Sequence, residues 1–232
     1  MCLIERMLKQ ILSKSVIALS CLLVTSAFAN DATSSLSVAP STVVELFTSQ
    51  GCSSCPPANK FVGELSDDQN VLVLSYGVTY WDYLGWKDTF GDAKFTSRQR
   101  AYGKAFDLNN VYTPQIVLNG SAHSPRYAIE DIKTMAIPQV GELQLSHADD
   151  SLVLEGESEL TVLVSYVPGW QAVDVGKGEN RGQTLRLANV VTDIKAVEPG
   201  VLNITPEKGL AYAVLSHDPN TKKVLSAAVF TP

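Results

Sequence analysis

The chain has 232 residues, of which 45% are hydrophobic, and a formal net charge of −6. This length is sufficient for one large domain or two small ones with their own hydrophobic cores. The acidic excess and the lack of a basic stripe argue against a nucleic-acid-binding protein, because neutralising a phosphate backbone takes clustered Lys and Arg. Arg98, Arg100 and Lys104 lie close together in the sequence. We expect them to form a solvated helix face.

Residues 1–29 have the pattern of a signal peptide. Basic residues precede a short apolar run over residues 16–24, and Ala27-Phe28-Ala29 follows as a small-x-small cleavage site. The apolar run is shorter than the roughly 20 residues that span a bilayer, which disfavours a retained anchor. We therefore predict a periplasmic or secreted protein with no stable membrane anchor after cleavage. Residues 30–39 are predicted to be an extended leader.

A cysteine pair stands between a predicted strand and a predicted helix. The β-prone run Val43–Phe47 ends in a polar turn that contains Cys52 and Cys55. After this turn, apolar residues recur with the i, i+3, i+4, i+7 spacing of one helix face: Ala58, Phe61, Val62 and Leu65. A Cys-x-x-Cys pair elsewhere can be half of a zinc site, but on a strand-to-helix turn it indicates a thioredoxin-like redox motif.

The chemistry of this pair depends on forming a thiolate. A helix N-terminus and the Cys-x-x-Cys spacing both lower a cysteine pKa from its free value of about 8.5. We expect Cys52 to be the exposed attacking thiol and Cys55 the buried thiol that resolves a mixed disulfide. Pro56-Pro57 shifts the expected helix start to one of these prolines, which weakens the activation of Cys52. The alternative is a disulfide that only staples the turn.

The next segments complete a βαβ unit and lead into an aromatic stretch. Val71–Tyr76 is a nearly continuous apolar run, which suits a strand buried on both faces. The stretch over residues 80–88 fits neither a helix nor a strand. Its rings either cover an edge of the core or face a substrate, and in the second case Tyr80, Trp81 and Trp86 are candidate substrate-binding residues.

Thr113-Pro114 stands between a helical pattern over residues 95–107 and a short β run that ends in the hairpin signal Asn119-Gly120. In thioredoxin folds a cis proline in this place faces the cysteine pair and exposes a backbone edge to a substrate strand. Only about 5–6% of X-Pro bonds are cis, so the position in the chain supports the assignment. We predict a cis bond against the cysteine turn, with Pro114 as a catalytic residue and Thr113 as a substrate-binding residue.

From about residue 140, short alternating apolar runs are separated by turn signals, which favours an antiparallel sandwich or meander. The predicted fold class is therefore an α/β thioredoxin-like domain over residues 40–138, followed by an all-β domain over residues 139–232. We expect the second domain to form a separate layer without catalytic residues. It contains no cysteine, and its two histidines, His147 and His217, fall in predicted turns or at strand ends.

The longer motifs resemble a family of secreted bacterial proteins known as domain of unknown function 1223. The matching stretches are residues 47–57, 80–88, 98–102 and 111–115, with residues 178–182 and 189–191 similar to the family's C-terminal part. The resemblance extends over nearly all of the mature chain. It implies a thioredoxin-like fold, and it implies no particular activity because the family has none assigned.

Three functions are consistent with these features. The leading one is an exported thiol–disulfide oxidoreductase or redox-active binding protein, without cofactor or metal, acting on envelope or secreted proteins through Cys52 and Cys55. Its partners would be bound by thiol exchange or strand contacts. The alternative is a non-enzymatic interaction protein with a structural disulfide. The third is a copper-handling thioredoxin-like protein in which the two cysteines and His123 hold a soft ion such as Cu(I).

The signal-peptide assignment predicts cleavage between Ala29 and Asn30 on export. N-terminal sequencing of the periplasmic or secreted form checks this. A mature protein that starts before residue 25, or that carries lipid on Cys21, contradicts it.

Overall fold

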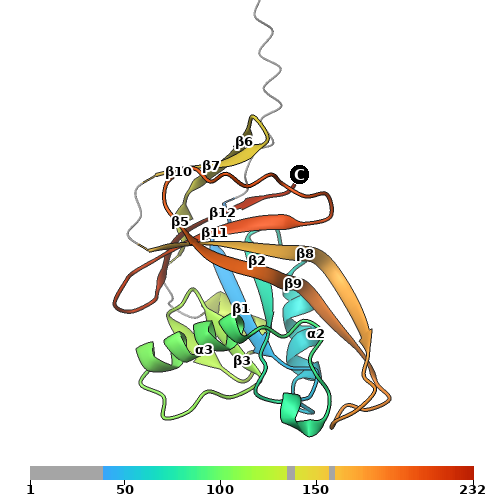
Figure 1. Ribbon diagram of the computed structural model, residues 1–232. Coiled ribbons are helices and arrows are strands. Elements are labelled where there is room, and N and C mark those ends of the chain that lie inside the picture. The colour runs from blue at the N-terminus through green and yellow to red at the C-terminus, as the bar shows by residue number, and fades with distance from the viewer. Residues whose placement is uncertain (1–38, 135–138, 157–159) are drawn as a thin grey trace, which may run out of the picture. The chain divides into compact units, whose positions relative to one another are not determined.

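A nine-stranded mixed sheet lies at the centre of a mixed α/β fold (Figure 1). The computed structural model describes residues 39–134, 139–156 and 160–232, so the predicted signal peptide and almost all of the leader lie outside the described residues. In spatial order the strands of the large sheet are β4 (Ala122–Ser124), β3 (Gln115–Leu118), β1 (Thr42–Thr48), β2 (Val71–Gly77), β9 (Thr184–Val197), β8 (Thr161–Asp174), β11 (Ala211–His217), β12 (Val224–Phe230) and β5 (Gly141–Glu142).

The remaining elements are a small second sheet and a few helices. The second sheet is antiparallel and contains β10 (Gly200–Val201), β7 (Ser151–Glu155) and β6 (Gln144–Ala148). The helices of the described residues are α2 (Pro56–Leu65), the 3-10 turn η1 (Asp82–Leu84), α3 (Ala93–Ala105) and α4 (Ile129–Thr134). None of these helices is long and apolar enough to cross a bilayer.

The βαβ unit is formed as predicted. β1 and β2 pair in parallel, with Thr42 opposite Val71, and α2 connects them. α2 begins at Pro56, which confirms the helix start inferred from the two prolines. Proline is tolerated there because the first amide groups of a helix have no intrahelical acceptor.

Alternating side chains of β1 separate two apolar layers. Val44 and Leu46 pack with the buried face of α2. Val43 and Phe47 point to the other face, where the Phe47 ring stacks on Tyr76 with centroids 5.2 Å apart, in the same cluster as the apolar residues of α3. Side chains of a strand point to opposite faces in turn, so the two clusters lie on opposite faces of the β1–β2 pair and both faces are covered.

The large sheet continues across the predicted domain boundary at residues 138 and 139. β9 lies beside β2 in parallel orientation, with Val190 opposite Ser75. Asn189, at φ 49°, donates from Nδ2 to the carbonyl of Val73 at 3.0 Å and accepts the amide of Gly169. The predicted β-rich domain therefore shares its main sheet with the predicted thioredoxin-like domain. Hydrophobic periodicity gives no information on which strand edges pair, so this continuity was missed.

β8 and β9 continue beyond the sheet as a long antiparallel hairpin, which we call the arm (residues 170–188; Figure 1). The arm packs on α2 through Trp170, whose ring occupies the space above Gly63. A Cβ atom at Gly63 would lie 1.9 Å from that ring, so no larger residue fits without moving it. The guanidinium of Arg186 covers Trp170 at 4.6 Å from the ring centroid.

A buried polar cluster joins β1, α3 and β11. Glu45 is 1% exposed, and its carboxylate accepts from Nε of Arg98 at 2.7 Å and from the hydroxyl of Tyr102. Nη2 of Arg98 lies 2.9 Å from Nε2 of His217. Since a guanidinium only donates, this Nε2 accepts and the neutral ring carries its proton on Nδ1. The expectation that Arg98 lies on a solvated helix face is wrong, because its side chain is only 12% exposed.

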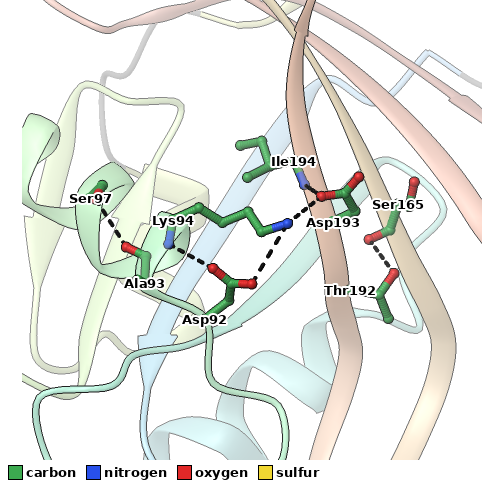
Figure 2. A network of polar contacts seen from close by, with 8 residues as sticks. All are labelled: Asp92, Ala93, Lys94, Ser97, Ser165, Thr192, Asp193 and Ile194. Atoms are coloured by element: carbon green, nitrogen blue, oxygen red, sulfur yellow. Dashed lines mark hydrogen bonds and ion pairs between the residues drawn. The ribbon is translucent and has the colours of Figure 1, made fainter.

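The N-terminus of α3 is linked to β9 by a second polar network (Figure 2). The Asp92 side chain caps α3 by accepting the amide of Lys94 at 2.8 Å. The Lys94 ammonium lies 2.5 Å from the carboxylate of Asp193 on β9 and 3.7 Å from that of Asp92. These side chains are about 40% exposed, so the link adds little stability compared with the buried cluster.

Burial and the Arg98 charge set the ionisation of this cluster. Burial alone would raise the pKa of Glu45, but the adjacent guanidinium outweighs it and lowers that pKa below 4.5. Burial, aided by Arg98, lowers the pKa of His217 from 6.5 to about 3. The folded chain therefore keeps His217 neutral in a pH range where the unfolded chain protonates it.

This difference predicts a measurable acid sensitivity. Stability contributed by neutral His217 is complete above pH 6.5 and is lost as the pH falls toward 3. We expect the free energy of unfolding of the natural chain to fall more steeply over this range than that of His217→Gln, by up to about 1.4 kcal/mol per pH unit. Denaturant unfolding at several pH values checks this, and parallel slopes for the two chains would refute it.

Candidate disulfide site

The disulfide between Cys52 and Cys55 spans the turn from β1 to α2, with the two Cα atoms 5.5 Å apart. The amide of Cys52 donates to the carbonyl of Ser49, and the amide of Cys55 donates to that of Cys52. Cys55 is the N-cap residue of α2, and its carbonyl accepts the amides of Ala58 and Asn59 at 3.0 Å each. The pair therefore lies at the N-terminal end of the helix, where unpaired amides favour an anion.

Both cysteines are completely buried, with 0% exposure. The prediction of an exposed Cys52 is therefore wrong for the disulfide form. Its sulfur lies 3.3 Å from the hydroxyl of Ser54. Trp81 lies against the turn: a Cβ atom at Gly51 would be 3.1 Å from the Trp81 Cβ.

The tip of the arm also contacts the turn. Nδ2 of Asn180 donates to the carbonyls of Gln50 and Cys52 at 2.9 Å each, and Asn180 is 1% exposed. The carboxylate of Glu179 accepts the amide of Ser53 at 3.1 Å. Hydrogen bonding from the side chain and from the amide of Ser53 lowers the pKa of Glu179. The expectation that the C-terminal segment forms a separate layer is therefore wrong, since it shares the large sheet and also contacts the cysteine turn.

Sequence reasoning noted residues 178–182 only as a family motif and gave them no role. A usable signal was the asparagine between two glycines, Gly178 and Gly182, in a loop between long strands. Both glycines have positive φ, 76° and 79°, which lets the loop fold back sharply. The partners of Asn180 lie about 130 positions away in the sequence, so no local pattern could identify them.

The aromatic stretch over residues 80–88 also contacts the turn. Nε1 of Trp86 donates to the side-chain carbonyl of Gln50 at 2.8 Å, and the amide of Gln50 donates to the Asp88 carboxylate at 2.8 Å. Burial raises the pKa of Asp88 to about 6, although hydrogen bonds from the amides of Gln50 and Phe90 oppose the shift. Asp82 accepts the amide of Asp88 at 3.2 Å, a local turn contact. The indole of Trp86 is thus hydrogen-bonded to the turn and helps to fix its conformation.

Thr113 and Pro114 lie beside the turn, and the bond between them is cis, as predicted. The hydroxyl of Ser54 lies 3.5 Å from the Thr113 carbonyl. The Thr113 hydroxyl accepts from Nε1 of Trp81 at 2.7 Å, which fixes the indole against the turn. Tyr80 is half-buried next to Trp81, with ring centroids 6.3 Å apart.

A groove of about 520 Å³ runs along this side of the turn. It is lined by residues of the cysteine turn, α2, β3 with the segment before it, and the segment after β4, among them Ser54, Phe61, Thr113, Pro114 and Tyr127. The structure thus brings Thr113 and Pro114 together with the turn and places both on the groove. Tyr80, Trp81 and Trp86 are not among its lining residues.

His123 is held by aromatic neighbours. Its Nδ1 lies 2.7 Å from the hydroxyl of Tyr112, and its ring contacts Phe106 with centroids 4.6 Å apart. Burial lowers the pKa of His123. Within the described ranges, no group of three or more His, Cys, Asp or Glu side chains is arranged to hold a metal ion.

Comparison with known proteins identifies relatives without an assigned activity. No curated protein matches the chain. The chain is similar to the crystal structure of protein AGR_C_4864 from Agrobacterium tumefaciens, with a TM-score of 0.65 and 29% sequence identity, over 83% of this chain and 95% of that one. A family profile described as "protein of unknown function" matches residues 43–230. The chain therefore belongs to the family of proteins of unknown function DUF1223.

Proposed function

We propose that the mature chain is an exported thiol–disulfide exchange protein that acts on envelope or secreted proteins. The observation that carries this proposal is the place of the disulfide. It lies at the N-terminal end of α2, next to a groove whose wall includes Thr113 and Pro114. A bond across two intervening residues closes a short loop, which stabilises a fold less than a long loop does. This position therefore favours a chemical role over a purely structural one.

A thioredoxin-like relationship for residues 40–138 is part of the proposal. It is supported by the order of elements: a parallel β1–α2–β2 unit, then α3, then the antiparallel hairpin of β3 and β4, then α4. The groove borders this unit at the cysteine turn, where a partner segment would have to lie to reach a sulfur atom.

The exchange reaction needs a partner with two thiols and no other reagent. A partner thiolate attacks the Cys52 sulfur, the bond between the cysteines breaks, and Cys55 leaves as a thiolate. The partner's second thiol, once deprotonated, attacks the partner sulfur of this mixed disulfide and releases Cys52. Two electrons and two protons pass to the chain, which ends with two thiols, while the partner gains a disulfide. The reverse sequence reduces a partner disulfide.

The burial of both sulfur atoms imposes a condition on this chemistry. A thiolate has to approach along the line of the disulfide bond, and both cysteines are 0% exposed while Asn180 is hydrogen-bonded to the turn and Trp81 lies beside it. We propose that the tip of the arm lifts during exchange, breaking the two hydrogen bonds of Asn180. The hydrogen bonds that would break are those of Asn180 and the one from the Ser53 amide to Glu179. Among the described residues, no ion pair joins the arm to the turn.

The same burial favours a second candidate function. If the arm stays closed, Cys52 and Cys55 form a structural bond at 0% exposure, and the chain acts as a non-enzymatic interaction protein. The two functions differ in whether the sulfur atoms ever react with a partner thiol.

Single cysteine variants separate these functions. We expect Cys55→Ser, expressed in the exporting host, to accumulate mixed disulfides with other proteins, because the sulfur that resolves them is absent. Cys52→Ser should accumulate none. Non-reducing gels with and without reductant check this, with the double variant Cys52→Ser/Cys55→Ser as the control. Absence of reducible adducts from both single variants would favour the structural bond.

Removal of the Asn180 side chain tests the role of the arm. Each lost hydrogen bond is worth about 0.5–1.5 kcal/mol, so we expect Asn180→Ala to raise the rate of disulfide reduction by dithiothreitol about tenfold. Trapping with an alkylating agent and mass spectrometry measures the rate. Arg181→Ala is the matched control, since the Arg181 side chain is exposed on the same loop. Equal rates for Asn180→Ala and the natural chain would contradict a gating role.

A further inference from the structure

A second cavity, of about 280 Å³, lies between α3 and the strands β8, β9 and β11. It shares no lining residue with the groove beside the disulfide. Apolar side chains form much of its wall, among them Leu160, Val162 and Ile194. Three cationic residues also line it, namely Lys94, Arg98 and Lys222, and no acidic residue does. This combination of apolar and cationic walls distinguishes the cavity from a packing defect in the core.

The Arg98 guanidinium, which lines this cavity, has N–H donors that are not used by its neighbours among the described residues. Its Nε donates to Glu45, and its Nη2 contacts Tyr102 and His217. Nη1 makes no hydrogen bond to any described residue. Arginine is fixed here by its buried partners, so its remaining N–H groups are held in place before a ligand arrives. Such preorganised charged donors favour an anionic acceptor such as a carboxylate oxygen.

The other two cations differ in how far they are already neutralised. The Lys94 ammonium is engaged by Asp92 and Asp193 at the N-terminus of α3 (Figure 2). The Lys222 ammonium donates to the carbonyl of Pro219 at 2.7 Å and has no carboxylate partner in the described part of the chain. Lys222 is half-buried, so its charge is available at the edge of the cavity.

We propose that this cavity binds a small organic carboxylate with a short unbranched apolar tail. The carboxylate would bind Nη1 of Arg98 and the ammonium of Lys222, and the tail would lie against Leu160, Val162 and Ile194. The volume is just below the range of about 300–1,000 Å³ that is typical of sites for drug-sized ligands, which favours a ligand smaller than those. This site does not depend on the disulfide chemistry, because the two share no residue.

Calorimetric titration of the mature chain with butanoate, hexanoate and octanoate tests the proposal, with hexanol and hexylamine as probes of matched length. Affinity should rise about fourfold per added CH₂ group until the cavity is full. Hexanoate should bind about tenfold more tightly than hexanol, because only the carboxylate makes charge-assisted hydrogen bonds. Hexylamine should not bind.

Variants at the edge of the cavity locate the site without disturbing Glu45, which would lose its buried partner if Arg98 were replaced. Lys222→Gln should weaken hexanoate binding about two- to fivefold, the range expected for a partly exposed ion pair. Lys223→Gln, which removes the same charge from an exposed neighbour that does not line the cavity, should leave binding unchanged.

Ala101→Leu should block the cavity from the exposed surface of α3 and abolish binding, whereas Ala93→Leu on the same helix should not. Circular dichroism confirms that each variant is folded. The proposal is overturned if hexanol or hexylamine binds as tightly as hexanoate, or if Ala101→Leu leaves binding intact. It is also overturned if no carboxylate gives a heat change at about 10 mM, where even weak sites with millimolar Kd are filled.

Discussion

The contact on which the candidate site depends is the pair of hydrogen bonds from Asn180 to the backbone of Gln50 and Cys52. These bonds attach a residue of the C-terminal half, itself 1% exposed, to the turn that holds the disulfide. The carbonyls involved belong to the turn itself, so the amide of Asn180 stabilises the shape of the turn. The turn is held by the arm through Asn180 and by the aromatic stretch through Trp86 and Asp88, so it has little freedom to open on its own.

The arm reaches the turn because the rest of the fold directs it there. Pairing of β9 with β2 at Val190 sets where the arm leaves the sheet, and Trp170 packed over Gly63 sets its path along α2. The buried ion pair of Glu45 and Arg98 joins α3 to β1, and the contact of Arg98 with His217 extends this link to β11. Both halves of the chain are therefore needed to form the covered disulfide, and a fragment ending near residue 140 would lack its cover.

The parts of the fold that follow from local chemistry were predictable. Neighbouring residues specify the start of α2 at Pro56. They also specify the hairpin turn between β6 and β7, where Asp149 and Asp150 both have positive φ. The burial of Arg98 could not be predicted from local sequence. Among polar neighbours on a helix Arg98 has the pattern of a surface residue, and only the long-range placement of Glu45 makes it a buried partner. Asn180 and His217 were missed for the same reason, since their partners lie more than 100 positions away.

The reduction potential of the Cys52–Cys55 disulfide tests the central claim most directly. Equilibration with glutathione or with a thioredoxin of known potential, followed by alkylation and mass spectrometry, measures it. An exchange protein should have a potential between about −270 and −120 mV, the range of dedicated thiol–disulfide oxidoreductases. A potential below about −300 mV would contradict the claim, because structural disulfides of secreted proteins lie there, and it would assign the bond to stabilising the turn.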